Sequence, residues 1–181
     1  MTQAHITACG GTTPCEGTTG DRSHGVHPIA VVQNEYSLLY RLEAEETLRP
    51  TRDLGITFVA YSPLGRGLLT ATVEDAATLA DNDARKRHPR FAAGNIAHNL
   101  DLVHRVAAIA QRKNCTPGQL ALAWLLAQGP DIIPIPGTKR KERLLENIGA
   151  LAVSLTAADI AEISSAIRPA SPPGCAIRKG R

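Results

Sequence analysis

The sequence predicts an α/β protein built on a parallel sheet. Three short apolar runs, at residues 28–34, 56–62 and 132–135, are bounded by proline, glycine or polar residues, as buried strands are. Segments with helical periodicity separate these runs, and strands that alternate with helices form parallel sheets. Such folds bind ligands in the loops at the carboxyl ends of the strands, so we expect a functional site there.

Residues 1–25 are expected to be irregular. Gly, Thr, Cys and Ser crowd this segment, which has neither strand nor helical periodicity. Cys9, Cys15, His24 and His27 could be written as a metal-binding set, but their spacings match no zinc motif. We therefore predict no metal site.

Composition argues against several classes of function. A hydrophobic content of 43% in 181 residues is enough for a core, whereas a net charge of +3 and 3% aromatic residues give no basis for nucleic-acid binding. No apolar run reaches the roughly 18 residues of a membrane span, and the N-terminus lacks the pattern of a secretion signal. Together with four scattered cysteines, this predicts a cytoplasmic protein that contacts neither nucleic acid nor membrane.

The first helical segments are less regular than the strands. Residues 43–54 are acidic at the front and end at a glycine, although Pro50 indicates that the regular helix begins there. Residues 70–95 are polar and predict a long connection, with a basic cluster at 85–90. Asn99 is expected to cap the next helix, whose apolar positions recur at helical spacing.

Two capping boxes predict later helix starts. Residues 116–119 place threonine at the cap and proline at the first helical position, and Thr156 with Asp159 repeats the arrangement. Another helix is expected at 141–150. Residues 169–181, with three prolines and three cations, are expected to be a flexible tail.

The third apolar run breaks into a turn that suits a phosphate. Gly137 allows a sharp turn, and the amides after Thr138 would lie at a helix N-terminus with Lys139, Arg140 and Arg143 nearby. Cations in the first turn of a helix oppose the helix dipole, so they are favourable there only beside an anion. The alternative is that the basic run is a solvated helix face.

Four sequence blocks resemble the aldo-keto reductases. They are QNEYSL at 33–38, YSPLGRGLLT at 61–70, TPGQLALAW at 116–124, and IPGTKR at 135–140 followed by EN at 146–147. The match extends over roughly residues 24–168. It implies a partial (β/α)8 TIM barrel at residues 26–168, comprising about strands six to eight and their helices.

The resemblance also implies an NADPH site. The implied residues are Gln33 and Tyr61 at the nicotinamide, Ser62, Leu64 and Arg66 at the pyrophosphate, Thr138, Lys139 and Arg143 at the adenosine 2′-phosphate, and Glu146 and Asn147 at the adenine. Taken singly, Tyr61 could be a plain strand-end aromatic, Gln33 a surface amide and Asn147 a helix-face residue.

The catalytic residues of the family are not in the matched blocks. The family reduces aldehydes and ketones by hydride transfer, with a tyrosine acid, a lysine, an aspartate and a histidine from the first half of the barrel. Met1 stands shortly before the block at Gln33, and neither Tyr36 nor Tyr40 fits the missing roles. We assign no catalytic residue and expect a truncated reductase that is inactive alone.

Other interpretations stay open. The chain could be a non-catalytic nucleotide-binding remnant, a half-barrel that associates with itself or another chain through exposed strand edges, or a product without function that is degraded. We interpret the missing half as a gene fragment, a frameshift or a separate partner chain. Upstream DNA that encodes no barrel half in any frame would contradict the first two.

Overall fold

The fold is organised around a four-stranded parallel sheet. In the computed structural model, which describes residues 6–8, 24–73 and 79–167, the strands lie side by side in chain order. The strands are β1 (Ile6–Ala8), β2 (Val31–Glu35), β3 (Thr57–Tyr61) and β4 (Ile132–Pro134). Gln33 pairs with Val59, and Val59 pairs with Ile133. The prediction of a parallel sheet is confirmed.

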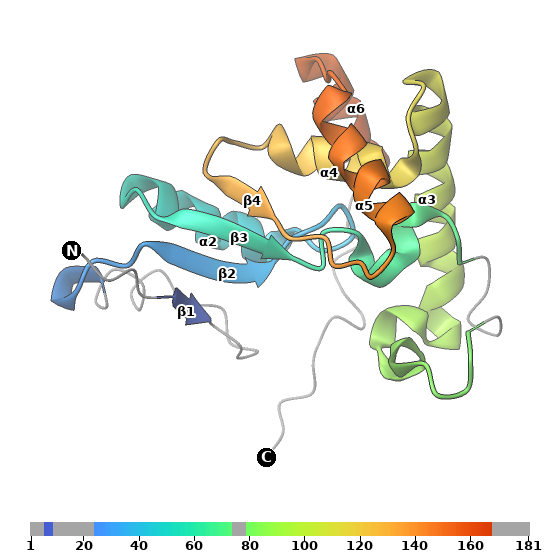
Figure 1. Cartoon of the computed structure of the whole chain (residues 1–181), viewed down its shortest axis with the longest axis horizontal. Coiled ribbons are helices and arrows are strands. Elements are labelled where there is room, and N and C mark those ends of the chain that lie inside the picture. Colours follow the sequence, from blue (N-terminus) through green and yellow to red (C-terminus); the bar gives the residue numbers. More distant parts are fainter. Residues whose placement is uncertain (1–5, 9–23, 74–78, 168–181) are drawn as a thin grey trace.

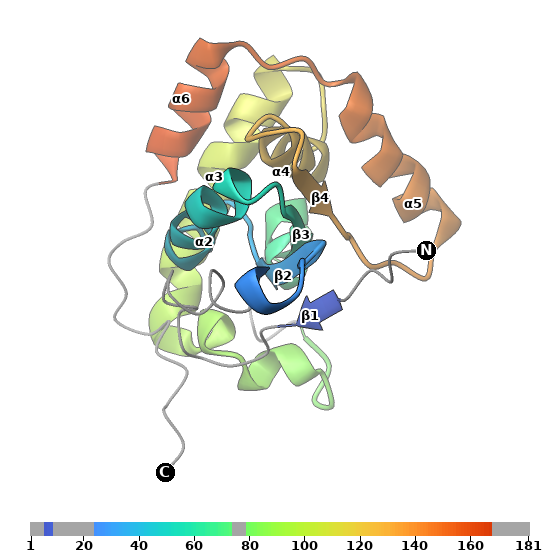
Figure 2. The same cartoon turned by 90° about the vertical axis from the view of Figure 1, so that its left-hand side faces the viewer.

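Helices connect the strands and gather mainly on one side of the sheet (Figure 1). The α-helices are α2 (Leu42–Asp53), α3 (Ala93–Arg112), α4 (Pro117–Leu126), α5 (Lys141–Ile148) and α6 (Ala157–Ala166). The 3-10 helices are η1 (Gly65–Thr70), η3 (Ala84–Arg87), η4 (Pro89–Phe91) and η5 (Gly149–Ala152). Figure 2 shows α5 standing apart from α2, α3 and α6. Within the described ranges, no helix has the length and apolar character needed to cross a membrane.

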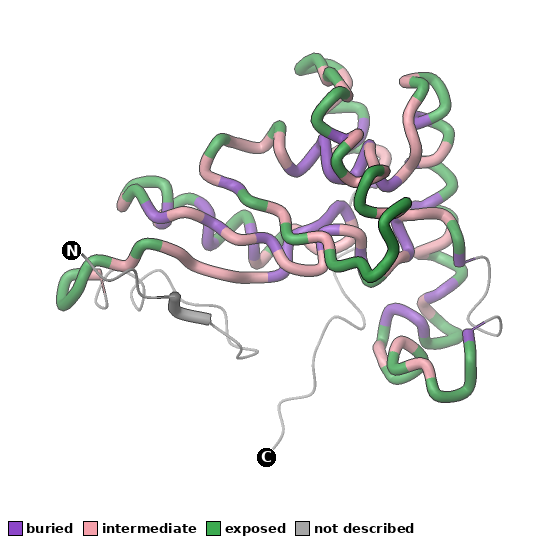
Figure 3. The backbone as a smooth tube through the Cα atoms, in the orientation of Figure 1, coloured by how far each residue is buried: buried purple, intermediate pink, exposed green. Residues whose placement is uncertain are grey.

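One face of the sheet packs on the helices. Phe58, Ala60 and Ile132 are buried and share a hydrophobic core with Trp124 of α4. Tyr36 packs edge-on against Phe58 and Trp124, with ring centroids 5.9 Å and 5.6 Å apart. Figure 3 shows buried positions where the strands meet the helices. This aromatic contact ties the end of β2 to α4.

The other face of the sheet, which we call the open face, carries Val31, Gln33, Glu35, Thr57, Val59, Tyr61 and Ile133. Its β3 positions are only half-buried, and Ile133 is 50% exposed. Ile135, just beyond β4, is 44% exposed. The prediction that the apolar runs are buried strands is therefore wrong for most of β2, whose first four residues are only half-buried, and for Ile133 of β4. Parallel sheets are usually covered on both faces, and on this one Arg90 of η4 packs over Glu35, whose side chain is 9% exposed.

Helix α3 begins at Ala93 and not at Asn99, so the predicted cap is wrong. Ile96 is buried and extends the apolar face of the helix towards its N-terminus. The side-chain amide of Asn99 instead donates to the carbonyl of Arg90, at 2.9 Å. Asn99 therefore holds the preceding loop against the helix.

Helix α2 is continuous through Pro50, contrary to the expectation that regular helix begins there. Its buried residues lie on one helical face and are Ala44, Thr47, Leu48 and Thr51. The Thr51 hydroxyl is 3.0 Å from the carbonyl oxygens of Thr47 and of Leu48. Packing of this face outweighs the missing N–H of one proline near the end of the helix.

Strand β1 corrects the prediction that all of residues 1–25 are irregular. Ile6 pairs with Val31 of β2. A strand of three residues is too short to show a periodic pattern, which explains why it was missed. Cys9, Cys15 and the predicted tail at 169–181 lie outside the described residues.

Both predicted capping boxes are confirmed. The backbone N–H of Gln119 donates to the Thr116 hydroxyl at 3.2 Å, and the backbone N–H of Thr116 donates to the side-chain oxygen of Gln119 at 3.0 Å. Thr156 and Asp159 make the same exchange at the start of α6. These local contacts place the starts of α4 and α6.

A buried ion pair joins the end of β2 to the loop before α3. The Arg90 guanidinium donates to the Glu35 carboxylate, and both side chains are 9% exposed. Arg90 also lies over the Tyr40 ring, 5.1 Å from its centroid.

Replacing Arg90 by methionine should lower the free energy of unfolding by about 3 kcal/mol or more, because Glu35 would remain as an unpaired buried charge. Urea denaturation measures the change. The control is Arg105→Met, which removes an exposed cation and should cost less than about 0.5 kcal/mol. A loss at Arg90 no larger than the control loss contradicts a stabilising pair.

Candidate functional site

A pocket of about 600 Å³ lies at the carboxyl ends of β3 and β4, where parallel sheets bind ligands. Four segments meet there: the turn after β3, the turn after β4, the first turn of α4, and α5. Its lining residues are Ser62, Pro63, Leu64, Arg66, Gly67, Thr70, Thr72, Gly118, Ile135, Pro136, Gly137, Thr138, Lys139, Arg140, Arg143, Glu146 and Asn147. All the predicted cofactor residues except Gln33 and Tyr61 are therefore in this pocket.

The turn after β3 has a strained backbone. Ser62 and Arg66 have φ values of 50° and 58°, in the left-handed region that non-glycine residues seldom occupy. Gly65 and Gly67 share this region, and the Gly65 N–H donates to the Ser62 carbonyl at 2.9 Å. Strain of this kind is retained mainly at functional sites, so it agrees with a ligand-binding role for the turn.

The turn after β4 presents cations beside an open helix N-terminus. Lys139, Arg140 and Lys141 are exposed, and α5 begins at Lys141 without a side-chain cap. The Thr138 hydroxyl accepts a hydrogen bond from the Arg140 N–H at 3.2 Å, which shapes the turn. A Cβ added at Gly137 would meet no atom within 4 Å, so there is free space next to the turn. Backbone N–H groups and cations together suit a phosphate.

Arg143 and Glu146 form an ion pair on α5. Their nearest side-chain atoms are 2.6 Å apart, and the Arg143 and Glu146 side chains are 36% and 23% exposed. The hydrogen bond from Arg143 is the main cause that lowers the pKa of Glu146, and a bond from Thr116 adds to it. Glu146 therefore stays ionised near neutral pH and orients the guanidinium of Arg143 at the pocket wall.

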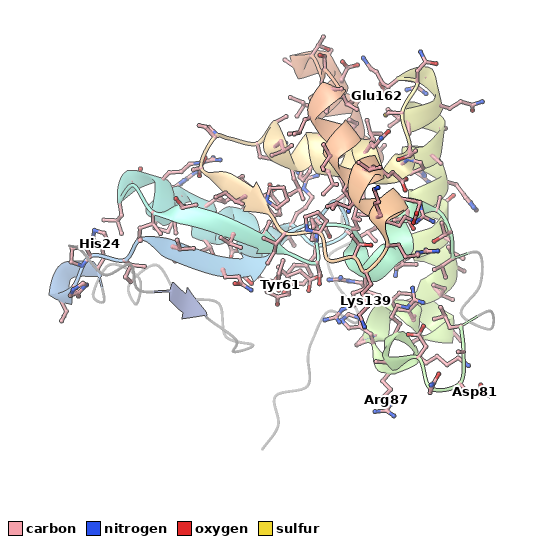
Figure 4. All side chains as sticks on the ribbon, viewed as in Figure 1. His24, Tyr61, Asp81, Arg87, Lys139 and Glu162 are labelled. Atoms are coloured by element: carbon pink, nitrogen blue, oxygen red, sulfur yellow. The ribbon has the colours of Figure 1, made fainter. Side chains whose placement is uncertain are left out.

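Gln33 and Tyr61 lie on the open face next to the pocket. Gln33 is in register with Val59, two residues before Tyr61, so the three side chains share this face. Burial, followed by the charge of Glu35, raises the pKa of the Tyr61 hydroxyl, which is therefore neutral at physiological pH. Figure 4 shows Tyr61 and Lys139 on the same side of the molecule. The open face thus leads towards the pocket.

Sequence analysis missed the contribution of the start of α4. Gly118 lines the pocket, and a Cβ added there would lie 3.7 Å from Thr70 and 3.8 Å from Leu64. These are ordinary van der Waals distances, so Gly118 has room for a side chain, and its low helix propensity was the only local signal at this position. Thr70 and Thr72, whose hydroxyls are 2.8 Å apart, were missed because threonines in a polar segment give no distinctive pattern.

The described residues contain no cluster of His, Cys, Asp or Glu that could hold a metal ion. The site instead combines a strained glycine-rich turn, an uncapped helix start and several cations. This arrangement can bind an elongated ligand with phosphates at two places along the pocket.

Comparison with known proteins identifies relatives of the same kind. The model of the aldo/keto reductase family matches residues 13–168. An aldo-keto reductase of Strobilurus tenacellus is 43% identical over 168 residues, which are 91% of this chain and 50% of that protein. The aldo-keto reductase yakc [NADP(+)] of Schizosaccharomyces pombe is 45% identical over 160 residues, which are 86% of this chain and 47% of that protein.

The fold has a counterpart among solved structures. A glycerol dehydrogenase from Gluconobacter oxydans superposes with a TM-score of 0.76 and 22% identity, over 86% of this chain and 49% of that one. The chain thus spans about half the length of the relatives that it matches. Sequence and fold agree, and the chain belongs to the aldo/keto reductase family.

Proposed function

We propose that the chain binds NADPH in this pocket and corresponds to the carboxyl-terminal half of the family barrel, about strands six to eight with their helices. The family generally uses NAD(P)H, and one relative carries NADP(+) in its name. The observation that carries the proposal is that one pocket joins the turn after β3 to the cationic turn and helix after β4.

The residues present fit the pyrophosphate and the adenosine 2′-phosphate of the cofactor. Ser62, Leu64 and Arg66 would hold the pyrophosphate at the turn after β3. At the adenosine 2′-phosphate, Lys139 would supply a mobile point charge, and the planar guanidinium of Arg143 would donate two parallel hydrogen bonds. Thr138 would complete that second site with its hydroxyl and the adjoining amides, and Glu146 and Asn147 would face the adenine.

The nicotinamide end would lie on the open face. Gln33 would donate to or accept from the carboxamide, and Tyr61 would stack on the ring with its hydroxyl protonated. When bound, NADPH supplies a hydride. None of the residues assigned above holds or moves a proton to a carbonyl oxygen, so we propose binding without carbonyl reduction by this chain alone.

A cytoplasmic location is part of this proposal. It is supported by Cys115, which is a free thiol, and the burial that raises its pKa keeps that thiol protonated. The carbonyl substrate of a complete barrel is not encoded in the residues of this pocket.

Mixing the chain with NADPH should enhance and blue-shift the cofactor fluorescence, with no oxidation of NADPH when an aldehyde is added.

Lys139→Met should weaken NADPH binding about fivefold and leave NADH binding unchanged, because only NADPH carries the 2′-phosphate. Arg105→Met, whose cation does not line the pocket, should bind as wild type. Equal losses for NADPH and NADH contradict the position of the 2′-phosphate, and aldehyde turnover contradicts binding without reduction.

Arg66→Gly should weaken cofactor binding without lowering the free energy of unfolding. Glycine relieves the left-handed backbone, so the free energy of unfolding should stay unchanged or rise by up to about 1 kcal/mol. Loss of the guanidinium should weaken NADPH and NADH alike, since both carry a pyrophosphate. Denaturant unfolding and fluorescence titration measure the two effects. A variant that binds both cofactors normally removes Arg66 from the site.

We also propose self-association as a second role, because apolar surface is exposed at one edge of the sheet. β4 is an edge strand, and Ile133 is half-exposed on it. Nearby, Leu144, Leu145, Ile148 and Leu151 are 49%, 59%, 52% and 74% exposed, at a spacing that places them along one side of α5 and η5. We call these four residues the α5 stripe. A second copy of the chain could cover it.

Sizing at micromolar concentration should therefore give a species larger than a monomer. Leu145→Lys with Ile148→Lys should shift the chain to monomer, because two charges would be buried in the contact. Leu42→Lys is the control, since Leu42 is 46% exposed on α2, outside the α5 stripe. A monomeric wild type contradicts self-association.

A further inference from the structure

We propose that Gln119 is a positioning residue for the pocket, because its side chain fastens α5 to the start of α4. By holding α5, it sets the affinity for the 2′-phosphate end of the cofactor. This inference rests on the proposed NADPH site. Its structural half, the fastening of α5, can be tested without any cofactor.

Hydrophobic burial does not hold α5 in place. None of its residues is buried, and its apolar side chains Leu144, Leu145 and Ile148 are about half exposed. Isolated helices of eight residues are not stable, so α5 depends on tertiary contacts. The polar contacts with the start of α4 therefore carry more weight here than they would in a helix with a buried face.

Gln119 uses the two halves of its amide for two different elements. The side-chain oxygen accepts from the Thr116 N–H at 3.0 Å and closes the capping box of α4. The side-chain N–H group donates to the backbone carbonyl of Glu146, at 3.0 Å. A glutamate would serve the capping box equally well, but it cannot make the second bond when ionised. The donor half of the amide is thus specific to the contact with α5.

Gly149 leaves room for this amide. A Cβ added at Gly149 would lie 2.4 Å from the side-chain nitrogen of Gln119. The backbone there has φ −58°, a helical value that any residue adopts, so conformation alone does not require glycine. The space at Gly149 is an independent sign that the end of α5 is fitted to the Gln119 side chain.

The contact acts on residues of the pocket wall. Glu146, whose backbone carbonyl accepts from Gln119, pairs through its carboxylate with Arg143. Arg143 and Glu146 line the pocket with Gly118, which lies beside Gln119 in α4. A shift of α5 would therefore move the Arg143 guanidinium relative to the turn at Lys139. We expect the larger loss for the ligand that carries a 2′-phosphate, and a smaller loss for one without it, because Glu146 and Asn147 of α5 would face the adenine of both.

Gln119→Glu is the test, with Gln128→Glu as the matched control. Gln128 donates to the carbonyl of Trp124 at 2.9 Å, so its replacement removes the same kind of bond at the other end of α4. Gln119→Glu should weaken NADP+ binding about fivefold to tenfold and weaken NAD+ binding less, because only NADP+ also loses its contact with Arg143. Hydrogen exchange at the α5 amides should quicken, while exchange in α2 stays the same. Gln128→Glu should change neither the affinity for the dinucleotides nor hydrogen exchange at α5.

Gly149→Ala provides a second test that leaves Gln119 in place. The added methyl group should displace the amide and reproduce the effects of Gln119→Glu, whereas it should cause no further loss in a Gln119→Ala background. Additive losses, or a Gln119→Glu variant with normal NADP+ affinity, would overturn the proposal. If wild type binds neither dinucleotide, the proposed function and the affinity claim both fail. Exchange at α5 then still decides whether Gln119 holds the helix.

Discussion

Parallel pairing of β3 with β2 and β4 is the constraint on which the candidate site depends. Strands that run the same way end at the same edge of a sheet, so the turn after Tyr61 and the turn after Pro134 lie together although they are far apart in the chain. Neither turn makes the pocket alone. The burial of Phe58 and Ile132 against α4 stabilises this register, because a slip by one residue would turn both side chains out of the core.

The locally unfavourable features of the chain are concentrated at this edge. Ser62 and Arg66 occupy left-handed backbone, and cations crowd the start of α5, where the helix dipole disfavours them. Away from this edge the capping boxes of α4 and α6 agree with local preference, whereas Pro50 lies inside α2 and Asn114 has φ 52°. The strain and the cations that meet at the pocket agree with a ligand-binding role there.

The parts that could be predicted from sequence are those with short-range causes. Capping boxes, the three predicted strand positions and the turn after β4 depend on neighbouring residues, and the structure contains them. The predictions at Asn99, Pro50 and Ile133 were wrong for one shared reason, since each depends on distant packing. Asn99 bonds to a loop, Pro50 is kept in α2 by a buried face, and Ile133 is half-exposed on the edge strand β4. The sequence indicated only the capping role of Gln119. Its second role was not predictable from local pattern, because the bond to α5 joins residues that are 27 positions apart.

Position on the sheet divides the proposed cofactor site into two parts. The residues proposed for the phosphates lie in turns and on α5, and their geometry depends on the start of α4 and not on what covers the open face. Gln33 and Tyr61 lie on the open face itself, where an uncovered ring would meet water on one side. Water screens charges and competes for hydrogen bonds at a reacting centre, whereas phosphate recognition by cations and amides tolerates partial exposure. The proposed nicotinamide contacts therefore depend more on what covers the open face than the proposed phosphate contacts do.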